Sequence, residues 1–176
     1  MDKLQKLDSL IVLLMFALLP IDMINGVMLG NEIILPITIG QLFKLLIIGV
    51  LFFRFFIFNF KLLLTSCLMF LLMLLPSFYQ MFTQLDASFL FSDIVKVSKY
   101  LTPLFCFFFF KDFITRQDPL ELKQLFKLVW FSYIVLVVNI LIKYIGLGYP
   151  MYKAGDIGSK GFFFAGNETS AMLIIL

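Results

Sequence analysis

Hydrophobic residues in this chain form long unbroken runs, and polar residues gather in the short stretches between them. A helix needs about 20 mainly apolar residues to cross the hydrocarbon core of a bilayer. Five runs meet that length, and a sixth begins at residue 169 and is cut off at Leu176. The five complete runs are residues 9–29, 37–58, 62–79, 89–110 and 124–145. The pattern predicts an all-α fold, a polytopic transmembrane helical bundle that forms a single domain.

The composition supports this prediction. Hydrophobic residues make up 62% of the chain and charged residues 14%, against about 45–50% and about 25% in ordinary globular domains. With 24 Phe in a chain of 176 residues, this surplus cannot be packed into a soluble core. The formal charge of +3 is therefore an orientation signal and indicates no nucleic-acid partner.

Basic residues occur in every second connection between the runs. They are Lys3 and Lys6, then Arg54 and Lys61, then Lys111, Arg116, Lys123 and Lys127. The alternate connections, 25–36 and 80–88, contain no Lys or Arg. Because basic loops stay in the cytoplasm, we expect a cytoplasmic N-terminus and an outer loop over residues 146–168, although this loop carries Lys153 and Lys160.

Several charged residues fall inside the runs. With a rise of 1.5 Å per residue, Lys99 lies about 18 Å, Asp22 about 21 Å and Lys44 about 22 Å from the inner ends of their helices, and Lys96 lies one turn above Lys99. All four residues fall in the outer half of a core about 30 Å thick. Charges at such depth are costly and commonly face a cavity, so they are candidates for function.

These charges allow two interpretations. In the structural one, Asp22 pairs with Lys44, Asp93 pairs with Lys96, and Lys99 extends outward along its apolar stem. In the functional one, the lysines form an anion site that opens to the outer leaflet. A lipid phosphate or diphosphate would suit such a site, because lysine binds phosphate as a point charge.

Metal and cofactor chemistry has little support in the sequence. The chain contains no His, and its two cysteines, Cys67 and Cys106, lie inside apolar runs without CxxC spacing. Buried thiols of this kind behave as small hydrophobic residues. We therefore predict neither a metal site nor a cofactor.

The most distinctive local pattern is the glycine-rich, charged and aromatic segment 158–170. Asn167 is a plausible N-cap of the next helix, and Glu168 would lie at the positive end of its dipole. The three consecutive Phe at 162–164 could form an interfacial aromatic belt. Capping and the belt are the structural alternatives to a functional role.

Taken whole, this segment resembles a known family. Lys160-Gly161-Phe162-Phe163 followed by Gly166-Asn167-Glu168-Thr169-Ser170 is similar to the "KGFF…GNE.S" pattern of bacterial O-antigen ligase/polymerase-type membrane proteins, and most of all to capsular and exopolysaccharide repeat-unit polymerases. Segments 19–26 and 39–44 resemble the first two helices of that family, and 93–99 resembles the fourth.

The resemblance implies a multi-pass glycosyltransferase in the bacterial cytoplasmic membrane. Such enzymes join repeat units carried on a polyprenyl diphosphate at the outer face of that membrane, and other polysaccharide-assembly membrane proteins are possible partners. The leaving diphosphate needs cationic groups, and the attacking sugar hydroxyl needs a base or an orienting group.

The resemblance also assigns roles to residues of this chain. Glu168 would position the sugar hydroxyl, and the catalytic residues are otherwise unknown. The proposed diphosphate-binding residues are Lys44, Lys96, Lys99 and Lys160, and the supporting residues are Asp22, Asp93 and Asn167. Family members carry a large basic outer loop further along the chain, so we expect this chain to be an N-terminal part that is inactive alone.

Two other classes of protein remain open. A small transporter, flippase or substrate-binding membrane subunit would use Asp22, Lys44 and Lys96 as a substrate or proton path. A non-catalytic membrane scaffold would explain the helices but not the charges within them.

Overall fold

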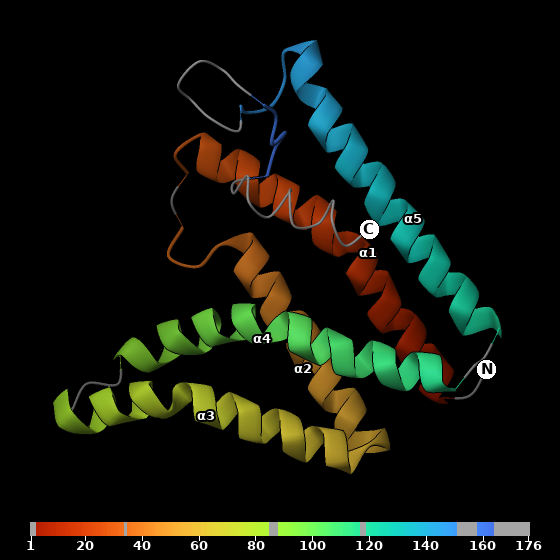
Figure 1. The fold of residues 1–176 in the computed structure, drawn as a ribbon. Helices are drawn as coiled ribbons and strands as arrows, with labels where there is room; N and C mark the ends of the chain where they lie inside the picture. The colour runs from red at the N-terminus through yellow and green to blue at the C-terminus, as the bar shows by residue number, and fades with distance from the viewer. Residues whose placement is uncertain (1–2, 34, 85–87, 117–118, 151–157, 164–176) are drawn as a thin grey trace. The chain divides into compact units, whose positions relative to one another are not determined.

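The computed structural model describes residues 3–33, 35–84, 88–116, 119–150 and 158–163, and these residues are almost entirely helical. The elements are α1 (Lys3–Gly30), α2 (Ile39–Phe58), α3 (Phe60–Gln84), α4 (Ser88–Thr115), α5 (Pro119–Leu141) and a 3₁₀ turn, η1 (Ile142–Ile145) (Figure 1). The described residues form no strand, only one antiparallel bridge between Tyr149 and Gly161. The predicted all-α fold is confirmed over this part of the chain.

Four of these helices are long and apolar enough to cross a membrane: α1, α2, α3 and the continuous stretch Leu122–Ile145. By the length and composition of its helices, the chain is a membrane protein. The predicted span 89–110 lies in α4, which is not one of the four because of the charged residues along it. The sixth run, from residue 169, lies outside the described residues.

Several helices extend five or six residues beyond the predicted runs, and the connection between α2 and α3 is shorter than predicted. The sequence predicted a connection at residues 59–61, but α2 ends at Phe58, α3 begins at Phe60, and Asn59 alone joins them. The Asn59 side chain accepts a hydrogen bond from the backbone N–H of Leu62 at 3.3 Å, which is N-cap geometry. Arg54, which the predicted run 37–58 contains although it was also counted with the basic connection, is a residue of α2.

The chain divides into two compact units. The first consists of Met1–Ile11 and Gln41–Glu121, and in it α3 and α4 lie side by side as an antiparallel pair (Figure 1). Its core is aromatic: Phe52 of α2 packs edge-on against Phe70 of α3 and Phe105 of α4, with ring centroids 6.3 and 5.2 Å apart. Phe105, Phe109 and Phe113 recur every four residues and are all buried, so one face of α4 is directed inward.

One face of α3 carries large apolar side chains that no described residue of the unit covers. Leu64, Leu68, Leu71 and Leu75 recur every three or four residues and are each more than half exposed. A contiguous apolar row of this size is unusual on a water-soluble protein. It is the surface expected of a helix that lies in lipid.

The second unit consists of Val12–Gly40 and Leu122–Leu176. The rings of Phe16 on α1 and Phe131 on α5 pack against each other, with their centroids 5.2 Å apart. Val12, Met15 and Leu19 form the buried row of α1, and Leu128 and Leu136 lie on the buried side of α5. This unit carries the described part of the loop that the sequence predicts to lie outside.

Candidate functional site

The segment Lys160–Phe163 is held against the end of α5 by one buried side chain. Asn139 is wholly buried, and its Nδ2 donates to the Lys160 carbonyl at 2.9 Å. Its Oδ1 accepts from the backbone N–H of Phe162 at 2.8 Å. An amide buried in an apolar helix is costly unless both of its ends are hydrogen-bonded. Asn139 meets that requirement by binding the loop backbone on both sides of Gly161.

Further hydrogen bonds attach the residues just before this segment. Ser159 Oγ donates to the Ile140 carbonyl at 2.7 Å, and Lys143 Nζ donates to the Gly158 carbonyl at 2.7 Å. The chain reverses at Gly146, whose left-handed backbone ends η1. The carbonyls at the end of a helix have no intrahelical partner, and Ser159 satisfies one of them here.

Gly161 is required by two separate constraints. Its φ is +58°, a region that residues with a Cβ rarely adopt. A Cβ added there would also collide with the backbone oxygen and the side chain of Asn139. The loop can lie this close to α5 only with glycine at this position.

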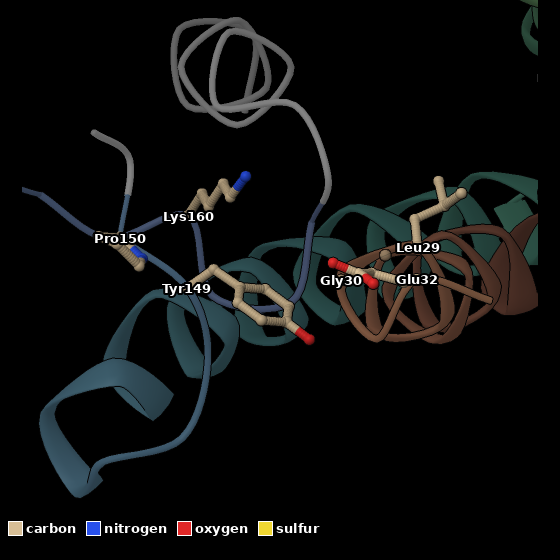
Figure 2. A pocket seen from close by; sticks show the side chains of 7 residues that line it. Leu29, Gly30, Glu32, Tyr149, Pro150 and Lys160 are labelled. Atoms are coloured by element: carbon tan, nitrogen blue, oxygen red, sulfur yellow. The ribbon is translucent and has the colours of Figure 1, made fainter. Parts of the chain in front are cut away.

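The anchored segment borders a pocket of about 330 Å³. Figure 2 shows the Tyr149 ring between Lys160 and the end of α1, where Glu32 directs its carboxylate toward the ring. Lys160 Nζ lies 6.0 Å from the centre of the Tyr149 ring, within cation–π range. Tyr149 packs so closely on Gly30 that a Cβ on Gly30 would overlap the ring.

This pocket therefore combines three kinds of chemistry. Lys160 supplies a cation, Glu32 a carboxylate, and Tyr149 an aromatic face with a hydroxyl. Glu32 has a φ of +61°, a strained conformation for a residue with a side chain, and such strain is most common at functional sites. The sequence predicted Lys160 but neither Glu32 nor Tyr149.

None of the other predicted residues is among those that line this pocket, and some fall outside the described chain. Asn167 and Glu168 belong to residues that the structure does not describe. Lys44 is half-buried on α2 in the first unit. Asp22 lies on α1 in the second unit, where a Cβ on Gly40 would be 2.8 Å from its Oδ1.

Lys96 and Lys99 both lie on α4, and the structure gives Lys96 the partner expected in the structural interpretation. Lys96 Nζ lies 3.2 Å from Asp93 Oδ1, and Ser77 Oγ of α3 donates to the other oxygen of Asp93 at 2.8 Å. The predicted Asp93–Lys96 pair is confirmed. The Lys96 side chain is still 62% exposed, and Lys99 is exposed as well.

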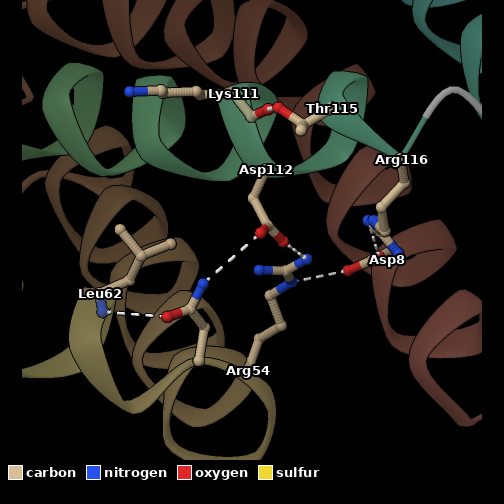
Figure 3. A network of polar contacts seen from close by, with 8 residues as sticks. Asp8, Arg54, Leu62, Lys111, Asp112, Thr115 and Arg116 are labelled. Atoms are coloured by element: carbon tan, nitrogen blue, oxygen red, sulfur yellow. Dashed lines mark hydrogen bonds and ion pairs between the residues drawn. The ribbon is translucent and has the colours of Figure 1, made fainter.

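A second polar cluster, in the first unit, was missed by the sequence analysis. We call Asp8, Arg54, Asp112 and Arg116 the ionic network (Figure 3). Arg54 is wholly buried, with Nε 2.8 Å from Asp8 and Nη2 2.5 Å from Asp112. Arg116 reaches the second oxygen of Asp8 at 2.5 Å. The Arg54 guanidinium also lies over the Phe109 ring at 5.2 Å.

The sequence held a signal for this network. Ile47, Leu51 and Phe55 form the buried row of α2, and Arg54 is seven residues after Ile47 on the same face. A charge on a buried face must find an opposite charge. Its position near the end of an apolar run made it resemble a loop residue, and the partners are 46 and 58 residues away.

No group of three metal-ligating side chains occurs among the residues that the structure describes. Comparison with models of protein families, with curated proteins and with solved structures found no match. The fold defines the class of protein, a helical membrane protein. The activity has to be inferred from the chemistry of the candidate site.

Proposed function

We propose that this chain belongs to a membrane glycosyltransferase that joins polyprenyl-diphosphate-linked oligosaccharide repeat units at the outer face of the bacterial cytoplasmic membrane. The observation that carries the proposal is the pocket in which Lys160 stands beside Tyr149 and Glu32. Lys160–Phe163 is also the segment in which the resemblance to polysaccharide polymerases is most distinctive, and Asn139 anchors its backbone.

The pocket offers the groups that this chemistry needs. The reaction breaks the bond between the anomeric carbon and the lipid diphosphate, so negative charge develops on the leaving oxygen, and a lysine ammonium stabilises it. Glu32 can accept a hydrogen bond from the attacking sugar hydroxyl. Tyr149 presents a flat apolar face with a polar tip, which suits a sugar ring.

The proposed threading has five spans and a cytoplasmic N-terminus. It places the ends of α1 and α5, and with them the pocket, on the outer side. It also places on that side the beginning of α2, which carries Lys44, and the first half of α4, which carries Lys96 and Lys99. These lysines would attract the anionic lipid carrier to the outer leaflet.

The proposal is tested in the host that encodes the chain. Deletion of the gene should abolish high-molecular-weight glycan and leave single lipid-linked repeat units in the outer leaflet. Complementation with Lys160→Gln should lower polymer yield by about 100-fold, the loss typical of removing one charge-stabilising group, whereas Lys127→Gln, an exposed lysine on α5, should restore it.

Each alternative class gives a different result. Repeat units retained in the inner leaflet would indicate a flippase instead. Unchanged polymer length after deletion, or full complementation by Lys160→Gln, would refute the polymerase proposal.

A further inference from the structure

A second pocket, of about 350 Å³, lies in the first unit between the beginning of α3 and the end of α4. Two lysines border it, Lys61 on α3 and Lys111 on α4. Its apolar side is formed by Leu62 and Phe108, and its polar side by Asn59 and Thr115. None of these residues belongs to the pocket around Lys160.

The charge at this pocket is positive. The ionic network beside it holds two carboxylates and two guanidinium groups, so its own charges cancel. Asp112 borders the pocket, but it is compensated, because one of its oxygens binds Arg54 and the other faces the Asn59 amide at 3.5 Å. Lys61 and Lys111 have no ion-pair partner within the part of the chain that the structure describes, which leaves two positive charges at the rim.

One buried donor of the ionic network lies near the pocket without bordering it. The third guanidinium nitrogen of Arg54, Nη1, takes no part in the ion pairs of the network. It is buried and makes no hydrogen bond to any described residue. Figure 3 shows it directed away from Asp8 and Asp112, toward the side where Leu62 lies. Arg54 does not border the pocket, so Nη1 is no direct ligand of a molecule bound there, and the cationic groups at the pocket are those of Lys61 and Lys111.

The surroundings indicate the source of the anion. Leu64 and Leu68 continue from the pocket along the lipid-facing row of α3, and Phe107 of α4 is 60% exposed. A free phosphate gains nothing from such a surface, whereas the acyl chains of a lipid bury it. We propose that this pocket binds the phosphate group of an anionic membrane lipid, with Lys61 and Lys111 as its cationic ligands. This inference is independent of the proposed glycosyltransferase activity.

The test uses the purified chain in neutral detergent and native mass spectrometry. The chain is titrated with phosphatidylglycerol and with phosphatidylcholine of the same acyl chains. We expect phosphatidylglycerol to bind more tightly, and the double variant Lys61→Gln/Lys111→Gln to weaken that binding about 30-fold, as expected for two lysines near an anionic headgroup. The matched control, Lys123→Gln/Lys127→Gln, removes the same charge from exposed positions on α5 and should bind within twofold of the wild type.

Three results would overturn the inference: equal binding of the two lipids, equal weakening in both double variants, or displacement of the lipid by millimolar inorganic phosphate, which would indicate a site for the free anion. Circular dichroism checks that the variants keep their helices. If the double variant loses helix content, the single variants Lys61→Gln and Lys111→Gln decide the question, each with an expected loss of about fivefold.

Discussion

Arg54 shows how one residue can set the chemistry of a whole region. It occupies a core position on α2 and is wholly buried, so its charge is tolerated only because Asp8 and Asp112 neutralise it at hydrogen-bonding distance. A buried ion pair adds little net stability over an apolar core of the same shape, but breaking one partner leaves an uncompensated charge. The network therefore restricts which ends of α1, α2 and α4 can pack together.

Replacing Arg54 tests this constraint. Arg54→Met fills the same space without charge and leaves Asp8 and Asp112 without their shared partner. We expect it to lower the free energy of unfolding by about 3–5 kcal/mol, measured by denaturant unfolding in mixed micelles. The quadruple variant Arg54→Met/Asp8→Asn/Asp112→Asn/Arg116→Gln removes all four charges of the network together, Arg116 included because it also binds Asp8, and should recover most of the loss. Equal stability of the single and quadruple variants would show that the ion pairs do not carry the effect.

At the scale of elements, the sequence predicts the helices well because each apolar run is a local property of the chain. The predicted end of the 124–145 run coincides with the end of η1 at Ile145, where Gly146 adopts a left-handed conformation. The end of the 37–58 run likewise coincides with the end of α2 at Phe58, but apolarity alone does not show that Arg54, four residues earlier, is wholly buried.

The candidate site was predicted only in part, for a related reason. Lys160 stands in a recognisable motif, but Glu32 and Tyr149 reach the same pocket from segments more than a hundred residues apart. Asn139 could have been noticed as an amide in an apolar run, where polar groups usually have a role. Its partners, the backbone groups of Lys160 and Phe162, carry no sequence signal at all.

Two glycines allow the loop anchor to be tested. Gly146 and Gly161 both have positive φ, +80° and +58°, but a Cβ on Gly146 meets nothing within 4 Å, whereas one on Gly161 would collide with Asn139. Gly146→Ala should therefore cost only the left-handed strain, about 1–2 kcal/mol. Gly161→Ala carries the same strain and also displaces the loop from Asn139.

The expected readouts are thermal unfolding and limited proteolysis of the loop. Gly161→Ala should lower the unfolding temperature more than Gly146→Ala and expose residues 158–163 to protease several-fold faster. Equal proteolysis of the two variants would contradict the anchoring role of Asn139.

At the scale of the whole chain, the ionic network bears on how the helices thread the membrane. Arg54 near the end of α2 and Asp112 near the end of α4 are in direct contact, and Asp8 near the beginning of α1 contacts Arg54. These three helix ends must lie on one side of a bilayer. The helix α3 leaves from that side after Asn59 and has the length and composition to cross.

We therefore predict that α4 crosses the membrane in spite of its charges. If α3 crosses, the chain reaches Gln84 on the far side, and only a second crossing brings Asp112 back to Arg54. Pairing of Asp93 with Lys96 and Ser77 lowers the cost of carrying those charges into the bilayer.

Single cysteines introduced after removal of Cys67 and Cys106 test whether α4 crosses the membrane. Thr83→Cys, at the end of α3, should react with a membrane-impermeant maleimide in intact cells. Lys61→Cys and Thr115→Cys should react only after permeabilisation. Labelling of Thr83→Cys and Thr115→Cys from the same side would mean that α4 does not cross, and the threading with five spans would then be wrong.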